Sequence, residues 1–173
     1  MNLRILASVV ALSVGGLSCG DPVHDEEVEA LGADPTGQPN GPTHRAGEPC
    51  LVCHGGQGPA HAQFSLAGTI YGTKGMTDAI EGAVVHLEDA TNKIVTVTSN
   101  SVGNFYIPLS DYAPTYPLNN ICIHGPSADS QTMFTHVMKQ GSCAGCHFGT
   151  PGPTTPGPVF ITDPTLMITE TCP

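Results

Sequence analysis

Tryptophan is absent from this 173-residue chain, and all aromatic residues together amount to only 5% of it. Basic residues are also scarce, because five Lys and Arg stand against 15 Asp and Glu and leave a formal net charge of −10. Nucleic acid attracts proteins mainly through basic side chains. The charge therefore excludes nucleic acid as a partner and favours basic proteins or cations, unless the acidity serves solubility alone.

Abundant residues point to a compact, loop-rich chain. Glycine (21) and proline (16) are frequent, which is typical of short strands joined by turns. The length suits one modest domain with tails. Such a domain buries little apolar surface, so we expect covalent cross-links or a bound cofactor to contribute to its stability.

No apolar run is long enough to cross a bilayer as a helix, which takes ~20 residues. The longest run, 5–17, follows Arg4 and is typical of a signal peptide over residues 1–18. Small residues before Cys19 resemble the cleavage box of bacterial lipoproteins, although Leu17 lies one place nearer the cysteine than usual. The resemblance implies that Cys19 becomes a lipidated N-terminus that anchors the protein to a membrane. Ordinary cleavage and a merely buried thiol remain the alternatives.

Residues 19–43 begin with this cysteine and continue with an acidic run and then Pro, Gly, Asn and Thr. They show no apolar periodicity, so we predict a disordered linker there. His24, within it, is expected to be solvated.

The rest of the chain favours a mainly β fold. Residues 83–88 alternate, which places Ala83, Val85 and Leu87 on one face of a strand. Connections between the strand-like runs are short and favour antiparallel pairing. We therefore predict a small antiparallel β-sandwich over 65–123, flanked by loop-rich segments at 44–64 and 124–173, the second of which also contains C-terminal strands. The strand-like runs lie at 66–72, 81–89, 93–100, 103–109, 119–125 and 158–164.

Three marks within this region resemble the carboxypeptidase-regulatory-like, transthyretin-type β-sandwich. They are Gly68-Thr69-Ile70 at a strand start, Gly82-Ala83-Val84-Val85, and the turn Gly103-Asn104-Phe105-Tyr106. In that family the module is structural or adhesive and performs no chemistry of its own.

Two C-x-x-C-H motifs carry the chemistry. They are Cys50-Leu51-Val52-Cys53-His54 and Cys143-Ala144-Gly145-Cys146-His147. Two thiols separated by two residues in a turn can bond the two vinyl groups of a porphyrin, and the adjacent histidine is then placed to bind the iron. Behind an export signal, two such motifs predict two covalently bound haem c groups, with Cys50, Cys53, Cys143 and Cys146 as thioether sites and His54 and His147 as proximal iron ligands.

Two other uses of paired cysteines remain open. Four thiolates can hold a tetrahedral zinc ion, but these pairs lie far apart in the sequence and both have the trailing histidine. Vicinal thiols can also act as redox dithiols, but no βαβ pattern surrounds either pair.

Two further cysteines, Cys122 and Cys172, are left without a role. Exported proteins commonly pair such cysteines. We predict a disulfide between them, with two separate buried thiols as the alternative.

From about His44 to Thr150 the chain resembles the small multihaem c-type lipoproteins of metal-reducing and related soil bacteria. Their plan places one CxxCH before a β-sandwich and another after it. The resemblance implies electron transfer with other cytochromes or redox proteins of the envelope, in the periplasm or at the outer membrane of a Gram-negative bacterium.

The sixth ligand of each iron is predicted from the remaining histidines. His44 and His136 precede the two motifs at similar spacings and are the first candidates; His61 is a weaker one for the first haem. His86 and His124 are expected to be exposed or to touch a haem. Methionine ligands would raise the reduction potential, but Met133 and Met138 are expected to fill gaps in the core.

No motif of a hydrolase, a phosphate-binding loop or an HExxH metalloprotease occurs. We therefore expect an electron carrier, not an enzyme. Two alternatives remain: a haem peroxidase or reductase with an open iron, and a non-catalytic β-sandwich surface module with a structural metal.

Overall fold

The computed structural model describes residues 21–35, 37–38, 40–74, 77–126, 130–162 and 172. The expected signal peptide and Cys19 lie outside these residues. Among the helices that are described, none has the length and apolar character needed to span a membrane.

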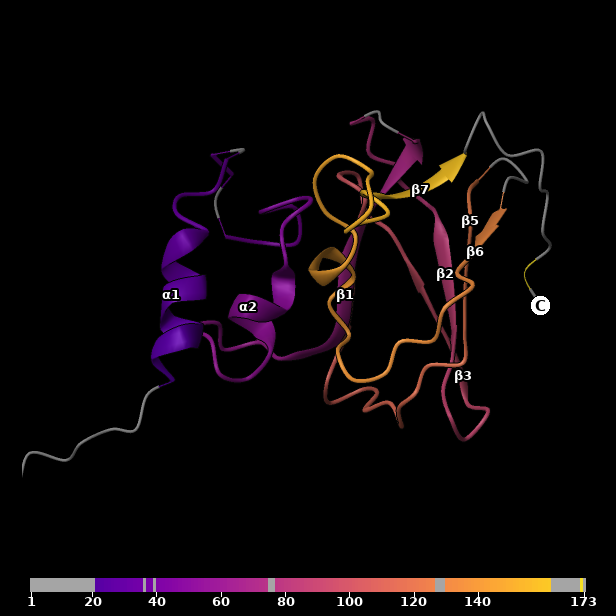
Figure 1. Cartoon of the computed structure of the whole chain (residues 1–173), viewed down its shortest axis with the longest axis horizontal. Helices are drawn as coiled ribbons and strands as arrows, with labels where there is room; N and C mark the ends of the chain where they lie inside the picture. Colours follow the sequence, from indigo (N-terminus) through magenta and orange to yellow (C-terminus); the bar gives the residue numbers. More distant parts are fainter. Residues whose placement is uncertain are drawn as a thin grey trace, which may run out of the picture.

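Two β-sheets face each other (Figure 1), which confirms the predicted mainly β sandwich. One sheet has the strand order β4-β1-β7, formed by Asn104–Pro108, Phe64–Thr73 and Val159–Thr162. The other has the order β3-β2-β5-β6, formed by Ile94–Thr98, Val84–Glu88, Asn120–His124 and Ser130–Thr132.

The sandwich differs from the prediction at its C-terminal side. β6 and β7 belong to residues 124–173, which we expected to lie at the end of the sandwich, and β6 was not predicted. β7 also pairs parallel to β1, so the first sheet is mixed and not purely antiparallel. The parallel pairing is possible because the long segment between β4 and β7 crosses to the other sheet and returns.

Alternating apolar residues from both sheets form the core. Ala83, Val85 and Leu87 are at most 1% exposed, as their predicted alternation requires. Strands β1, β4 and β5 contribute six further large members of the core: Leu66, Ile70, Phe105, Ile107, Ile121 and Ile123.

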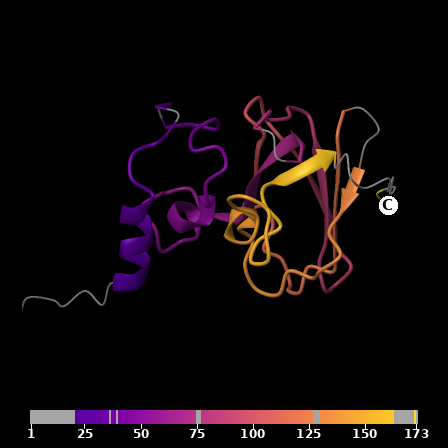
Figure 2. The same ribbon diagram turned by 45° about the horizontal axis from the view of Figure 1, so that its top comes forward.

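Strand β1 is covered on both faces, since every residue from Ser65 to Ile70 is buried. One face meets the sandwich core. Helix α2 (Cys50–His54) and the 3-10 helix η1 (Cys143–Gly145) also contact this strand. Both CxxCH motifs therefore lie against β1 (Figures 1 and 2).

The predicted disordered linker at 19–43 is wrong at residues 22–30, which form helix α1 (Pro22–Ala30). Asp21 caps this helix by accepting hydrogen bonds from the N–H groups of Val23 and His24, and Pro22 suits its first turn. Arg45 donates to the carbonyl oxygens of Leu31 and Gly32 just after the helix. Apolar periodicity did not reveal α1 because its ends are fixed by polar contacts and none of its residues is buried.

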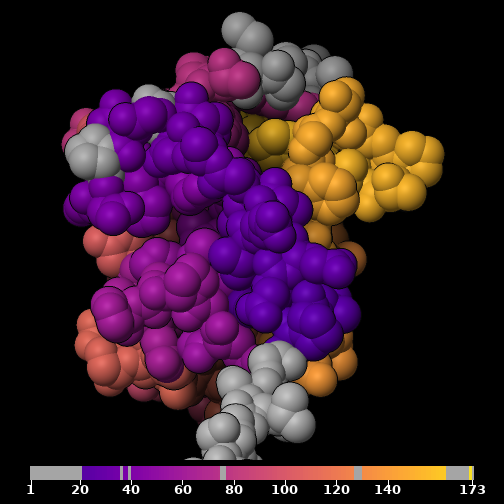
Figure 3. Space-filling model, turned by 90° about the vertical axis from the view of Figure 1, so that its left-hand side faces the viewer, coloured from indigo at the N-terminus to yellow at the C-terminus, as the bar shows by residue number. Residues whose placement is uncertain are grey.

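Helix α1 contacts α2, and together with the following loops it covers one side of the sandwich. Viewed from that side, residues from the N-terminal third of the chain spread over most of the surface, with part of the C-terminal segment beside them (Figure 3). The N-terminal region thus encloses the first CxxCH motif instead of holding it away on a tether.

A disulfide joins Cys122 to Cys172, the pair assigned from the sequence, with the two Cα atoms 5.6 Å apart. It ties residue 172 to β5 across a sequence separation of 50 residues.

Candidate functional site

The first CxxCH motif forms a single helical turn. α2 follows Pro49 and ends at Gly55. Residues three and four apart on a helix share one face, so Cys50, Cys53 and His54 lie along one side of the turn. This is the arrangement that attachment through two thioethers and an adjacent axial imidazole requires.

Backbone carbonyl oxygens fix the rings of two histidines beside this turn. The Nδ1 of His54 donates to the carbonyl oxygen of Ala62 at 2.7 Å, and the Nδ1 of His44 donates to that of Gly41. Because a carbonyl can only accept, the proton lies on Nδ1 and each Nε2 keeps a free lone pair. Histidines that bind metals usually hold their other nitrogen in this way.

The rings of His44 and His54 also have a suitable separation. Their centroids are 5.8 Å apart and their planes are inclined by 47°. Two imidazoles that bind one metal from opposite sides have centres roughly 6 Å apart, since each metal–nitrogen distance is ~2 Å. The separation of the two rings is therefore compatible with both imidazoles binding one iron, to which a porphyrin would supply the other four ligands.

A cavity of about 560 Å³ surrounds these groups. Sites for organic cofactors have volumes of ~300–1,000 Å³, so a porphyrin fits here by size. The Phe64 ring stacks on His54 at 4.2 Å and on Tyr106 at 4.6 Å and forms a flat apolar wall. The exposed His61 lines the same cavity.

A buried hydrogen-bond network fixes the segment that carries His44. Thr69 of β1 accepts from the N–H of Gly47 at 2.8 Å and donates to the side chain of Asn104 at 2.7 Å. Asn104 of β4 in turn donates to the carbonyl oxygen of His44 at 3.0 Å. The backbone at His44 is therefore held by the sheet, although His44 itself lies in a loop.

The second CxxCH motif begins in η1, which lies against β1 of the sheet β4-β1-β7. Residues 141–142 extend alongside β1, where the N–H of Ala67 donates to the carbonyl oxygen of Gly141 at 3.0 Å. Gly68 leaves room for the motif, because a Cβ atom there would be 2.8 Å from the Cβ of Cys143.

His147 repeats the pattern of the first site. Its Nδ1 donates to the carbonyl oxygen of Gly157 at 3.0 Å and leaves Nε2 free. Burial lowers the pKa of His147, and the hydrogen bond to Gly157 only partly opposes this. The ring is accordingly neutral at neutral pH, the form that binds a metal.

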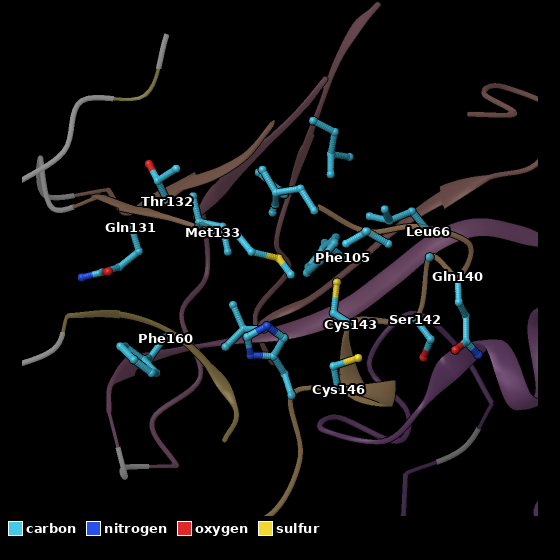
Figure 4. A pocket seen from close by; sticks show the side chains of 18 residues that line it. Leu66, Phe105, Gln131, Thr132, Met133, Gln140, Ser142, Cys143, Cys146 and Phe160 are labelled. Carbon is cyan, nitrogen blue, oxygen red and sulfur yellow. The ribbon is translucent and has the colours of Figure 1, made fainter. Parts of the chain in front are cut away.

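A smaller cavity of about 170 Å³ lies beside this motif and extends between the two sheets. Cys143, Cys146 and His147 line it together with Met133 and core residues such as Phe105. The sulfur atoms of Cys143 and Met133 point toward the same space (Figure 4). The donors and apolar walls suit a haem, of which a cavity of this volume would hold only part.

The two motifs, which are about ninety residues apart in sequence, lie near each other in the fold. Both contact β1, and the Cys50 thiol is among the groups that raise the pKa of Cys143. Figures 1 and 2 both place α2 and η1 side by side. Groups attached at the two motifs would therefore be neighbours.

The first thiol of each motif has the wrong acidity for a redox dithiol. Burial raises the pKa of Cys50 to about 11 and that of Cys143 to about 12. Reactive dithiols instead have a lowered pKa, because the thiolate is the nucleophile. All four motif cysteines are free thiols in the fold, and this alternative gains no support from it.

The zinc alternative gains no support either. Over the described parts of the chain, no three His, Cys, Asp or Glu side chains are gathered in a way that could hold a metal ion. A haem needs no such group, because the porphyrin supplies four ligands and the protein only one or two.

The other candidate ligands are distributed unevenly. His136 is exposed and lines neither cavity, whereas Met133, expected to be a core residue, packs against the core and also reaches the second cavity. Met138 is 69% exposed.

His86 and His124 contact each other on the outer face of the second sheet, and neither of them lines a cavity described above. Their pairing was not predicted, although both stand at outward positions of strand-like runs.

Comparison with known proteins identifies no relative: no family model, no curated protein and no solved structure matches this chain.

Proposed function

We propose that this protein is an exported dihaem c-type cytochrome that carries electrons at the cell envelope. The proposal is supported above all by one observation made at both CxxCH motifs. Each motif folds as a tight turn against β1, and each adjacent histidine has Nδ1 bound to a backbone carbonyl and Nε2 free.

The residues have distinct roles in this proposal. Cys50 and Cys53 attach the first haem, and Cys143 and Cys146 the second; His54 and His147 bind the two irons from the proximal side. His44 is the sixth ligand at the first site, in keeping with its ring position. When bound, each haem accepts and releases one electron at its iron.

The second site calls for a different sixth ligand from the one first predicted. His136 lies in solvent, and among the residues lining the second cavity His147 is the sole histidine. We assign this role to Met133, whose thioether reaches the cavity. Bound there, a methionine would raise the reduction potential of the iron relative to two histidine ligands.

Charge and anchoring define the setting. The acidic chain, at −10 overall, suits a basic redox protein as its partner and disfavours nucleic acid. A lipid on Cys19 would hold it to a membrane of the envelope, and its close partners would be other cytochromes or redox proteins.

Haem attachment is tested on the mature full-length protein. A pyridine haemochrome spectrum with intact mass spectrometry should count two covalent haems. The variants Cys50→Ala and Cys143→Ala should each keep one stable haem and lose or weaken the other. A colourless mature protein, or full haem content in both variants, would overturn the proposal.

A second function, haem-dependent peroxidase or reductase, is favoured by the lack of a second histidine at the second cavity. Carbon monoxide distinguishes the two functions. An electron carrier with Met133 bound should ignore carbon monoxide in the ferrous state. Met133→Leu should then bind it, and Met138→Leu, which changes an exposed methionine, should not. If the unaltered ferrous protein binds carbon monoxide, the result would favour a peroxidase or reductase.

A further inference from the structure

Two histidines face each other on the sheet that carries neither CxxCH motif. His86 of β2 and His124 of β5 have their Nε2 atoms 3.1 Å apart, so one donates a hydrogen bond to the other. Their ring centroids are 5.1 Å apart with an interplanar angle of 28°. Neither residue lines either haem cavity, and no step of the proposed function uses them.

Strand register explains why the two rings meet. His124 is paired with Val84 and His86 with Cys122, so the histidines are diagonal neighbours across one antiparallel pair. Their strand neighbours Val85 and Ile123 point inward and are buried. Both imidazoles therefore lie on the outer face, where they are half-buried.

The position of the two nitrogens suits a shared metal ion. With metal–nitrogen distances of ~2.0–2.1 Å, a nitrogen separation of 3.1 Å corresponds to an angle of roughly 100° at the metal. This lies between the angles of square-planar and tetrahedral complexes. A metal ion would lie to one side of the line that joins the two nitrogens, so each ring would turn to direct its Nε2 lone pair at the ion in place of the shared proton.

We propose that His86 and His124 form a two-histidine site for a late first-row divalent metal, with copper(II) bound most strongly. Imidazole nitrogen suits copper, nickel and zinc, and copper stands highest in the general affinity order. Within the described residues no third His, Cys, Asp or Glu completes the group, so water fills the other positions. Two protein ligands are fewer than resident zinc sites use, and the ion is accordingly exchangeable.

The site is tested by titrating copper(II) into the full-length mature protein after alkylation of any free thiols. Calorimetry should show one ion per chain, and electron paramagnetic resonance should show two nitrogen ligands. His86→Gln and His124→Gln should each weaken binding at least tenfold. His136→Gln, which alters an exposed histidine without such a partner, should leave it unchanged. Haem content and circular dichroism verify the fold of each variant.

Two results would overturn the site: equal copper binding in the double variant His86→Gln/His124→Gln, or a resonance signal without nitrogen ligands in the unaltered protein. The resonance measurement needs no variant, and a signal without nitrogen ligands would overturn the site even if the substitutions disturb the sheet. In a chain without haem the free Nε2 atoms of His44 and His54 could also bind copper, so the result that supports the site is weaker binding in the His86 and His124 variants than in His136→Gln.

Discussion

The hydrogen bond of each ring distinguishes the proposed histidine ligands of iron from the pair His86 and His124. His44, His54 and His147 each use Nδ1 to donate to a backbone carbonyl and leave Nε2 free. His86 and His124 instead use Nε2 for each other. Since backbone carbonyls are fixed by the fold, the three rings are oriented before any metal binds, which reduces the ordering needed on binding.

His44→Ala should convert the first haem from a low-spin to a high-spin form, because no other histidine in that cavity has its ring facing His54. Absorption spectra of the ferric protein measure the change, and half of the low-spin signal should be lost. His61→Ala, in the same cavity but exposed, is the matched control and should keep the spectrum. The reverse pattern would make His61 the ligand.

Asp89 has a structural role that depends on pH. It is 2% exposed and accepts hydrogen bonds from the Thr91 hydroxyl at 2.6 Å and the Tyr112 hydroxyl at 3.0 Å. These bonds, that from Thr91 above all, lower the pKa of Asp89 below its ordinary 3.8, although burial opposes them. The ionised carboxylate therefore stabilises the fold above pH ~4, and this contribution is lost as the pH falls further.

Asp89→Asn should lower the urea midpoint at pH 7, where the carboxylate is ionised. The difference from the unaltered protein should narrow as the pH falls below 3.8, the ordinary value. Asp111→Asn, at an exposed position, is the control and should have little effect at any pH. A difference that stays constant down to the lowest accessible pH would contradict the role given to ionisation.

At the scale of elements, β1 organises the molecule. It pairs with β4 on one side and with β7 and residue 142 on the other. Its sequence predicted a strand correctly. The unbroken burial from Ser65 to Ile70 was not predictable, because it depends on both faces being covered by segments distant in the chain.

Gly68→Ala tests the contact between β1 and the second motif. The added methyl group would lie 2.8 Å from the Cβ of Cys143 and 3.1 Å from the Phe105 ring. Overpacking of this kind costs ~1–3 kcal/mol, so the denaturation midpoint should fall and the second haem should be attached less completely. Gly152→Ala, with no atom nearer than 3.9 Å, should change neither. Normal haem content in Gly68→Ala would show that η1 adjusts freely.

On the scale of the whole molecule, the N-terminal region, the sandwich and the disulfide act as one unit. Helix α1 contacts the turn of the first motif, and residue 172 is tied to β5. A small fold with an incompletely filled core, here with a cavity of about 170 Å³, has much to gain from such a cross-link.

Cys122→Ala/Cys172→Ala should destabilise the protein by about 4 kcal/mol, the chain-entropy estimate for a loop of 50 residues. Urea unfolding of the haem-loaded protein measures the loss, and haem content should stay at two because neither cysteine lies in a motif. An unchanged midpoint would show that the disulfide restrains the C-terminal segment alone.

The sequence by itself determined every strand except β6, through alternation such as that of 83–88, and it determined the two CxxCH motifs, because both patterns are local in the chain. It also singled out Cys122 and Cys172 by elimination. Tertiary structure alone decided which side chains meet: it placed Met133 and not His136 at the second cavity, paired His86 with His124, and replaced the expected linker with α1. These outcomes depend on register, sheet order and contacts between distant segments, and no local pattern in a sequence encodes them.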